Sequence, residues 1–74
     1  MITTAMNNVS KKFGQRVRTI RLKQGLSQGD VAKRLDVHRS YISGIERGIR
    51  NPSLRVIQRI AKALEVPMEK LIKD

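Results

Sequence analysis

Two short segments with helical spacing of apolar residues, 28–35 and 39–47, are separated by only about three residues. Apolar side chains recur at positions 31, 32 and 35 of the first segment and at positions 42 and 45 of the second, and this spacing predicts helices with one buried face. So short a connection makes the helices cross at a sharp angle, and the small Ala32 stands where that crossing falls. The sequence therefore predicts a rigid pair of helices whose second member exposes its outer face.

The remaining segments predict three more helices and no strand. Segment 10–24 carries Phe13, Val17 and Ile20 on one face, which Gln24 continues, and Gly25 ends it. The stripe of segment 54–64 consists of Leu54, Ile57, Ile60, Ala61 and Leu64. Pro67 ends that pattern and starts a short fifth helix. We therefore expect an all-α, compact five-helix domain over residues 10–74, preceded by a flexible N-terminal segment, 1–9.

Two local signals define the ends of the 28–35 helix. Ser27 followed three residues later by Asp30 is a capping-box pattern, with Asp in place of the commoner Glu. Asp36 follows the helix, and Asp tolerates a left-handed turn conformation better than most residues. The turn between the two central helices is therefore expected at Asp36 and Val37.

The charge of the chain is large and unevenly distributed. The 74 residues include 16 Lys or Arg and 6 Asp or Glu, a net charge of +10. Segment 11–59 holds 13 basic and 3 acidic side chains, whereas segment 60–74 holds three of each. A field of this kind attracts nucleic acid first and an anionic membrane second. The membrane alternative fails because segment 10–24 needs its apolar face for the core.

Composition excludes several other classes of function. The chain has no Cys and one His, so a disulfide scaffold, a thiolate metal site and a cysteine nucleophile are absent, and we expect no metal and no cofactor. No acid–base pair stands near an activated nucleophile, so an enzyme is not expected. Uninterrupted apolar runs reach only two or three residues, and residues 1–10 show no secretory signal. We expect a cytoplasmic protein.

From about Phe13 to Leu71 the chain resembles the Cro/C1-type helix-turn-helix repressors, the lambda-repressor-like DNA-binding domains. The resemblance rests on Gly14, Arg21, Leu26-Ser27-Gln28, Val31-Ala32, Tyr41-Ile42-Ser43, Ile45-Glu46-Arg47-Gly48, Asn51-Pro52-Ser53, Ala61-Lys62-Ala63-Leu64 and Val66. Within this family, segment 38–48 is similar to restriction–modification controller proteins. The resemblance implies a transcription regulator that binds double-stranded DNA as a dimer, at a near-palindromic operator, with the 39–47 helix in the major groove.

The resemblance also implies which residues read bases. Arg39, Ser40 and Gly44 match the family's base-contacting positions, and Ser43 shares their outward face. Arg39 is the best-placed reader because the guanidinium fork suits guanine O6 and N7. Gly44 either permits close approach to the duplex or is simply tolerated in the helix.

A second set of residues is expected at the sugar-phosphate backbone, and it consists of Gln28, Tyr41, Arg47, Arg50 and Asn51. By resemblance, Gln28 binds a phosphate and supports the 39–47 helix. Tyr41 either places its hydroxyl on a phosphate or is a half-buried packing residue. Lys11, Arg16 and Arg18 are further candidates, although only one face of their helix can reach the same strand.

Two further expectations concern the supporting structure. Arg21 and Glu46 match family positions that form a partly buried ion pair, and we hypothesise that they hold the 39–47 helix at its angle. His38 stands where the family usually has a Ser or Thr cap, so an irregular start of that helix is expected. His38 either touches a phosphate or lies in solvent, and we expect the second.

The partner surfaces are expected at the C-terminal end. The fifth helix carries more apolar surface than its own packing needs, at Met68, Leu71 and Ile72. These residues are therefore predicted to form the homodimer interface. The alternative is that they only cap the core. A small dimer of this kind can block RNA polymerase or recruit it. An antitoxin or other protein-interaction module, with DNA binding secondary, is the alternative function.

Overall fold

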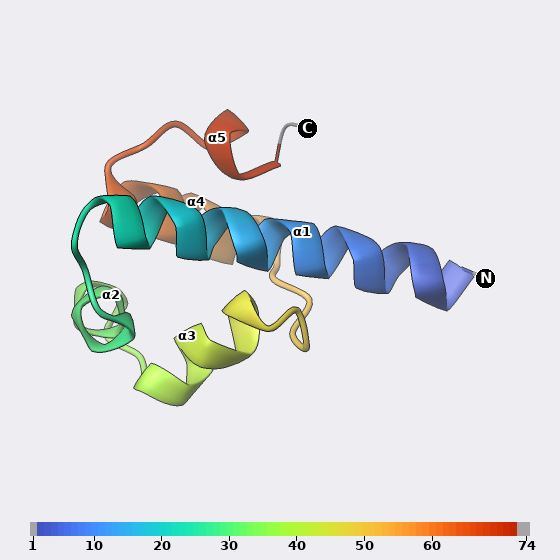
Figure 1. Ribbon diagram of the computed structural model, residues 1–74, viewed down its shortest axis with the longest axis horizontal. Coiled ribbons are helices and arrows are strands. Elements are labelled where there is room, and N and C mark those ends of the chain that lie inside the picture. The colour runs from blue at the N-terminus through green and yellow to red at the C-terminus, as the bar shows by residue number, and fades with distance from the viewer. Residues whose placement is uncertain (1, 73–74) are drawn as a thin grey trace.

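The computed structural model describes residues 2–72, with side chains described from residue 9, and this part of the chain forms five helices (Figure 1). They are α1 (Ile2–Lys23), α2 (Gln28–Leu35), α3 (Arg39–Glu46), α4 (Leu54–Leu64) and α5 (Glu69–Ile72). No strand occurs within residues 2–72. The predicted all-α, five-helix architecture is confirmed.

The first helix starts earlier than the predicted segment 10–24. It begins at Ile2 rather than Ser10, so a helix occupies most of the segment that was expected to be flexible. Residues 2–9 contain no Pro or Gly, and extending an existing helix costs far less than nucleating one. In Figure 1 this N-terminal half of α1 projects beyond the other helices.

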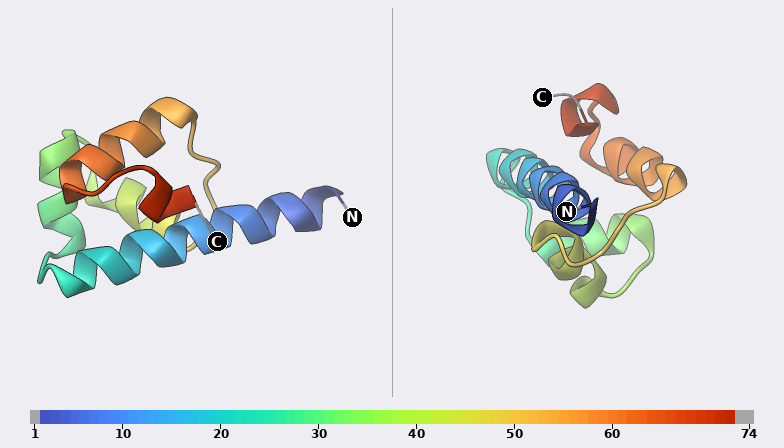
Figure 2. Two further views of the ribbon diagram at one scale, coloured as in Figure 1. Left: turned by 90° about the horizontal axis from the view of Figure 1, so that it is seen from above. Right: turned by 90° about the vertical axis from the view of Figure 1, so that its right-hand side faces the viewer.

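The long first helix divides the molecule into two sides. In the view of Figure 1, α2 and α3 lie below α1, α5 lies above it and α4 runs behind it, and the turned views of Figure 2 show the same order. The core fills the space where these helices meet. Its fully buried side chains are Val17, Val31, Ile42, Ile45, Ile60, Leu64 and Leu71.

Two apolar residues lie in environments other than those expected. Leu54 is 65% exposed although helical spacing places it on the same face as Ile57 and Ile60. The spacing defines a face but not how far along the helix its neighbours reach. Leu71 is 0% exposed in the core of its own chain, so it has no surface to offer a second copy. The role predicted for Leu71 in a dimer interface is corrected accordingly.

The ends of α2 agree with the local signals in the sequence. The Asp30 amide donates to Ser27 Oγ at 2.9 Å, and the Ser27 amide donates to Asp30 Oδ2 at 2.8 Å, which completes the predicted capping box. The hydrogen bond that the Ser27 amide donates to the Asp30 carboxylate lowers the pKa of this carboxyl. Asp36 has a left-handed conformation with φ of 58°. The tight turn between α2 and α3 is therefore confirmed.

Residues 2–72 offer neither a membrane span nor a metal cluster. None of the helices there combines the length and the apolar character that a membrane span requires. The side chains described there also include no group of three or more His, Cys, Asp or Glu that could hold a metal ion.

Candidate nucleic-acid interface

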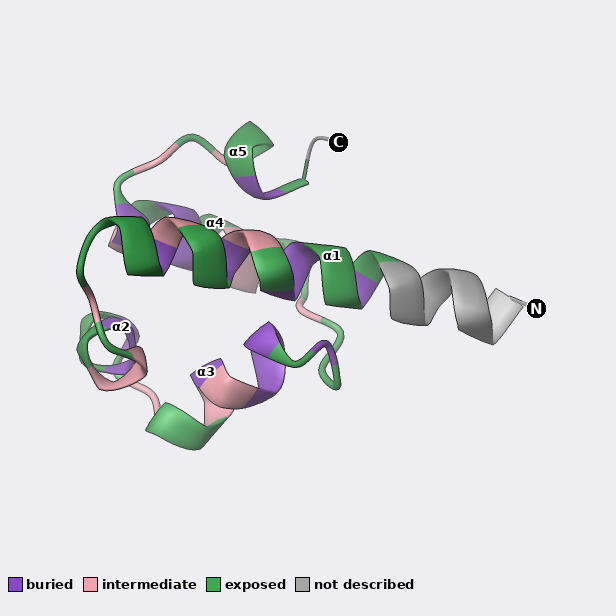
Figure 3. Ribbon diagram, in the orientation of Figure 1, coloured by how far each residue is buried: buried purple, intermediate pink, exposed green. Residues whose placement is uncertain are grey.

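Helix α3 is exposed in its first turn and half-buried or buried beyond it (Figure 3). Ile42 and Ile45 are 0% and 1% exposed and hold α3 against α1 and α2. Arg39 and Ser40 lie on the exposed side, and Ser43 is half-buried at its edge. The helix is thus fixed from behind while its N-terminal turn stays open to a ligand.

The start of α3 is regular, because His38 caps it. The Ser40 amide donates to Nδ1 of His38 at 3.1 Å, and the Ser40 hydroxyl lies 2.8 Å from the same nitrogen. An imidazole nitrogen thereby does what a Ser or Thr oxygen usually does at this position. The expectation of an irregular helix start was wrong, and His38 orients Ser40.

Gly44 is not open to the outside, because the side chain of Arg50 covers it. A Cβ added at Gly44 would lie 3.1 Å from Nε and 3.4 Å from Cγ of Arg50. The guanidinium of Arg50 continues over the ring of Tyr41, 5.0 Å from its centroid, and Tyr41 itself is half-buried against the core. Gly44 therefore makes room for Arg50, which corrects its expected role as a surface that a base approaches directly.

A buried polar network ties α3 to the two helices behind it. Arg21 of α1 donates to Glu46 of α3 through Nε at 2.6 Å and through Nη2 at 3.0 Å, so the structure contains the expected ion pair. Gln28 Nε2 of α2 donates to the same carboxylate at 3.1 Å. The hydrogen bond to Glu46 raises the pKa of Arg21. Both side chains of the pair are more than nine-tenths buried.

The segment after α3 brings the remaining candidate residues to the same end of the molecule. Arg47 is exposed at the C-cap of α3, and Arg50 and Asn51 follow it in the connection to α4. The Ser10 hydroxyl of α1 donates to Oδ1 of Asn51 at 2.5 Å. The acceptor of Asn51 is therefore occupied, and its Nδ2 group is the part that can donate to a ligand.

A residue without an expected role, Gly14, determines how closely α1 and α3 approach. A Cβ at Gly14 would lie 2.2 Å from the carbonyl oxygen of Ile45 and 2.7 Å from that of Glu46. Any other residue would push the two helices apart. The available signal was a glycine inside a strongly amphipathic helix, where it costs about 1 kcal/mol relative to Ala.

The charges around α3 are almost entirely of one sign. Glu46 is the only carboxylate between residues 37 and 64, a segment that also contains six Lys or Arg. That carboxylate is neutralised by its buried partner Arg21. The accessible side of α3 and the following connection therefore carry a net positive charge that attracts an anion, with the exposed Asp36 as the carboxylate that precedes the helix.

Comparison with known proteins defines the family. The Helix-turn-helix family model HTH_3 matches residues 17–71, a range that contains the α2–α3 pair and most of the core. The chain belongs to the Cro/C1-type helix-turn-helix family. Within this helix-turn-helix protein, α2 and α3 are the two helices of the motif and α3 is the recognition helix.

Three proteins similar to this chain are control or controller proteins. Control protein C.BamHI of Bacillus amyloliquefaciens is 52% identical over 67 residues, 89% of this chain and 83% of the relative. The crystal structure of the restriction–modification controller C.AhdI of Aeromonas hydrophila superposes with a TM-score of 0.79 at 46% identity, covering 82% and 92% of the two chains. The controller C.Esp1396I was solved as a tetramer in complex with its natural 35 base-pair operator. A chain of that structure superposes with a TM-score of 0.75 at 39% identity, covering 80% of this chain and 78% of the other.

Proposed function

We propose that this chain is a transcription regulator of the restriction–modification controller type that binds a specific double-stranded DNA operator through α3. The observation that carries the proposal is the build of α3, which is anchored by a buried ion pair and exposes Arg39 and Ser40, with the exposed Arg47 and Arg50 after them. An α-helix with an open outer face fits the major groove of B-form DNA. The relatives named as controllers support the same function.

Base readout is proposed for Arg39, Ser40 and Ser43. Arg39 can donate two parallel hydrogen bonds to guanine, and such a pair contributes about 1–3 kcal/mol of discrimination. Ser40 directs its hydroxyl toward His38, which leaves the oxygen as an acceptor from adenine or cytosine amino groups. Gly44 contributes to this surface indirectly, by seating Arg50.

Contacts to the phosphates are proposed on both sides of the recognition helix. Gln28 lies at the start of α2, and Tyr41, Arg47, Arg50 and Asn51 lie along and after α3. These contacts position α3 on the duplex without reading sequence. Because Gln28 also donates to Glu46, the phosphate contact and the support of α3 are coupled in one side chain.

The assembly is proposed to be a homodimer formed through the end of α5 and acting in the cytoplasm. Ile72 is 52% exposed there, Met68 is half-buried beside it and Leu71 fills the core beneath. A two-fold axis would place two α3 helices about 34 Å apart, one turn of DNA. Such a dimer regulates by blocking RNA polymerase at one site or recruiting it from another.

Selection of bound duplexes from a random DNA pool tests the proposal. We expect enrichment of a near-palindromic sequence with half-sites about one helical turn apart. Arg39→Ala should lower affinity for the selected duplex and relax its preference at one base position in each half-site. Lys62→Ala removes the same charge from the exposed surface of α4 and should leave that preference unchanged.

Two results contradict this function. If no sequence is enriched while affinity falls steeply with salt, the charge serves phosphate contact alone, and a protein partner becomes the primary function. If Arg39→Ala and Lys62→Ala affect base preference equally, α3 is not the reading element.

A further inference from the structure

Lys11 of α1 is held against the connection that follows α3. Gly48 has a positive φ of 75°, and a Cβ added there would lie 2.6 Å from Cγ and 2.8 Å from Cα of Lys11. The backbone of α1 and the end of the recognition helix are therefore in direct contact at this point. The position of Lys11 relative to α3 is set by packing and not by a flexible loop.

A surface hollow of about 240 Å³ lies at this contact. It is lined by Ser10, Lys11, Gly48, Ile49, Arg50 and Asn51. None of the six is acidic, and two are cationic. Ser10 occupies the acceptor of Asn51, so the amide presents its donor side. A hollow that offers an ammonium group and an amide donor matches the chemistry of a phosphate group.

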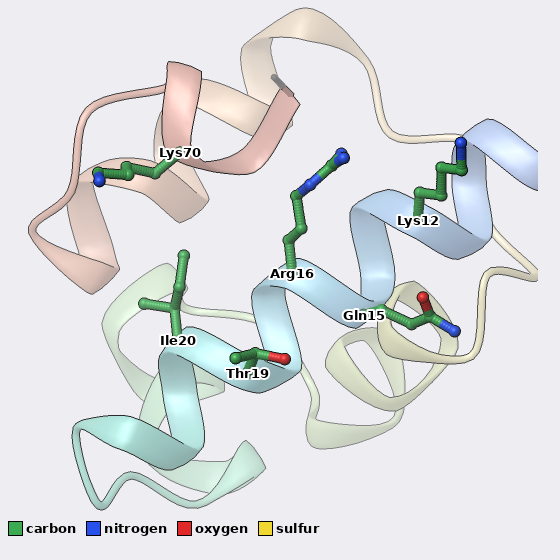
Figure 4. A pocket seen from close by; sticks show the side chains of 6 residues that line it. All are labelled: Lys12, Gln15, Arg16, Thr19, Ile20 and Lys70. Atoms are coloured by element: carbon green, nitrogen blue, oxygen red, sulfur yellow. The ribbon is translucent and has the colours of Figure 1, made fainter. Parts of the chain in front are cut away.

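The two cations of the hollow come from different segments of the chain, Lys11 from α1 and Arg50 from the connection after α3. The guanidinium of Arg50 is directed over the ring of Tyr41, toward the recognition helix. Lys11 comes from α1, where its stem packs against Gly48. The neighbouring Lys12 lies instead in the groove between α1 and α5, as Figure 4 shows. The adjacent residues Lys11 and Lys12 thus belong to two different surfaces, and only the surface that contains Lys11 is continuous with α3.

We propose that Lys11, together with Asn51 and Arg50, binds a backbone phosphate of the operator and so extends the DNA contact from the helix-turn-helix motif onto α1. The proposal rests on the proposed DNA-binding function and adds a positioning residue to it. Because the phosphate is common to every sequence, Lys11 contributes affinity and register but no base preference.

Salt titration of binding to the selected duplex tests this role. Lys11→Met keeps the apolar stem that packs on Gly48 and removes the charge. The slope of log K against log salt should become shallower by about 0.9 for each phosphate that the variant no longer neutralises, while base preference stays as in the unsubstituted protein. Lys11→Arg should retain the slope. Lys12→Met, the matched control on the α5 side, should also retain it, and thermal unfolding should show all three variants folded.

A neutral linkage in the DNA identifies the ligand as a particular operator phosphate. Methylphosphonates placed one at a time along the half-site should weaken binding of the unsubstituted protein at one flanking position and have no further effect there on Lys11→Met. If Lys11→Met and Lys12→Met give the same slope, or no position shows this weakening, the Lys11 site is refuted while the function of α3 stands. If the unsubstituted protein binds no duplex at all, both the proposed function and the Lys11 site are overturned.

Discussion

Single buried residues fix the orientation of α3, and the substitution of Glu46 is expected to have the largest effect on it. Its carboxylate accepts hydrogen bonds from Arg21 and Gln28 in an environment closed to water. Burying such a pair brings little net stability, but removing one partner leaves the other charge buried and unpaired. The main effect of the pair is therefore on the position of α3: any displacement of this helix that separates the two charges is costly, although the intact pair adds little to overall stability.

Glu46→Ala should lower the free energy of unfolding by about 3–5 kcal/mol, because Arg21 is left buried without its counter-ion. Urea denaturation followed by helix content measures the decrease. Glu69→Ala, which removes a carboxylate from the exposed start of α5, should change stability by less than about 0.5 kcal/mol. Equal effects of the two substitutions would show that the ion pair does not hold α3.

Gly44→Ala should separate folding from binding. Alanine is favoured in a helix by about 1 kcal/mol, and the three atoms nearest to the added Cβ, from 3.1 Å outward, all belong to the movable side chain of Arg50. Stability should therefore hold or rise, while affinity for the operator falls because Arg50 is displaced from its seat beside Tyr41. Thermal unfolding and duplex titration report the two quantities separately.

Gly29→Ala is the matched control for this change, since a Cβ at Gly29 meets only Ser27 Oγ at 3.6 Å. It should gain stability while its affinity stays unchanged. Identical affinities for the two alanine variants would rule out the seating role of Gly44.

The sequence predicted some of these contacts and not others. The capping box at Ser27 and Asp30 was predictable because both partners lie within one turn of the chain. The pairing of Arg21 with Glu46 followed only from the family resemblance, since 25 residues separate the partners. The imidazole cap at His38 depends on one ring orientation, and the stacking of Arg50 on Tyr41 depends on the path of the connection after α3. Neither leaves a pattern in the sequence.

At the level of whole helices, the crossing of α1 and α3 at Gly14 is a contact of backbone against backbone. The missing side chain brings the carbonyl groups of Ile45 and Glu46 against the backbone of α1. A backbone carbonyl inside a helix cannot rotate away as the end of Arg50 can. Replacement by alanine is therefore expected to lower stability at Gly14 and to keep or raise it at Gly44.

Gly14→Ala should destabilise the protein by at least about 1–3 kcal/mol, the usual cost of overpacking, despite its better helix propensity. Operator affinity should fall as well, because α3 is displaced relative to α2. Comparison of thermal unfolding with Gly29→Ala, where the added Cβ makes only an ordinary contact with Ser27 Oγ at 3.6 Å, isolates the steric effect. A Gly14→Ala protein as stable as Gly29→Ala would mean that α1 and α3 adjust freely.

The predictability of each helix depended on its end signals. Helices α2 to α4 have end signals such as a capping Ser or a left-handed turn, and their predicted ranges agree with the structure to within one residue, whereas α5 begins at Glu69 and not at Pro67. Residues 2–9 carry no stop signal, and Ile2, Met6 and Val9 continue the helical spacing of segment 10–24, so the sequence does contain the signal for the longer helix that α1 forms. Spacing identified the buried faces correctly but not their extent along the axis, as Leu54 shows.

For the whole molecule, charge and apolar surface are segregated in a way that suits a dimer on DNA. The positive segment 11–59 includes α3 and its flanking connection, whereas segment 60–74 is electrically balanced and contains the exposed Ile72. Two copies can therefore approach through their α5 ends without strong repulsion, while their recognition helices face one polyanion. Composition predicted this separation, but it did not reveal that Leu71 belongs to the core.

Ile72→Glu should shift the protein toward monomer and weaken operator binding, because each half-site then has to be bound independently. The fold of the single chain should survive, since Ile72 is 52% exposed, whereas Leu71→Glu should unfold it, since Leu71 is 0% exposed. Light scattering over a concentration series, with thermal unfolding of both variants, separates these effects. If the protein is monomeric at high micromolar concentration, and Ile72→Glu leaves operator affinity unchanged, α5 only packs on the core and forms no dimer interface.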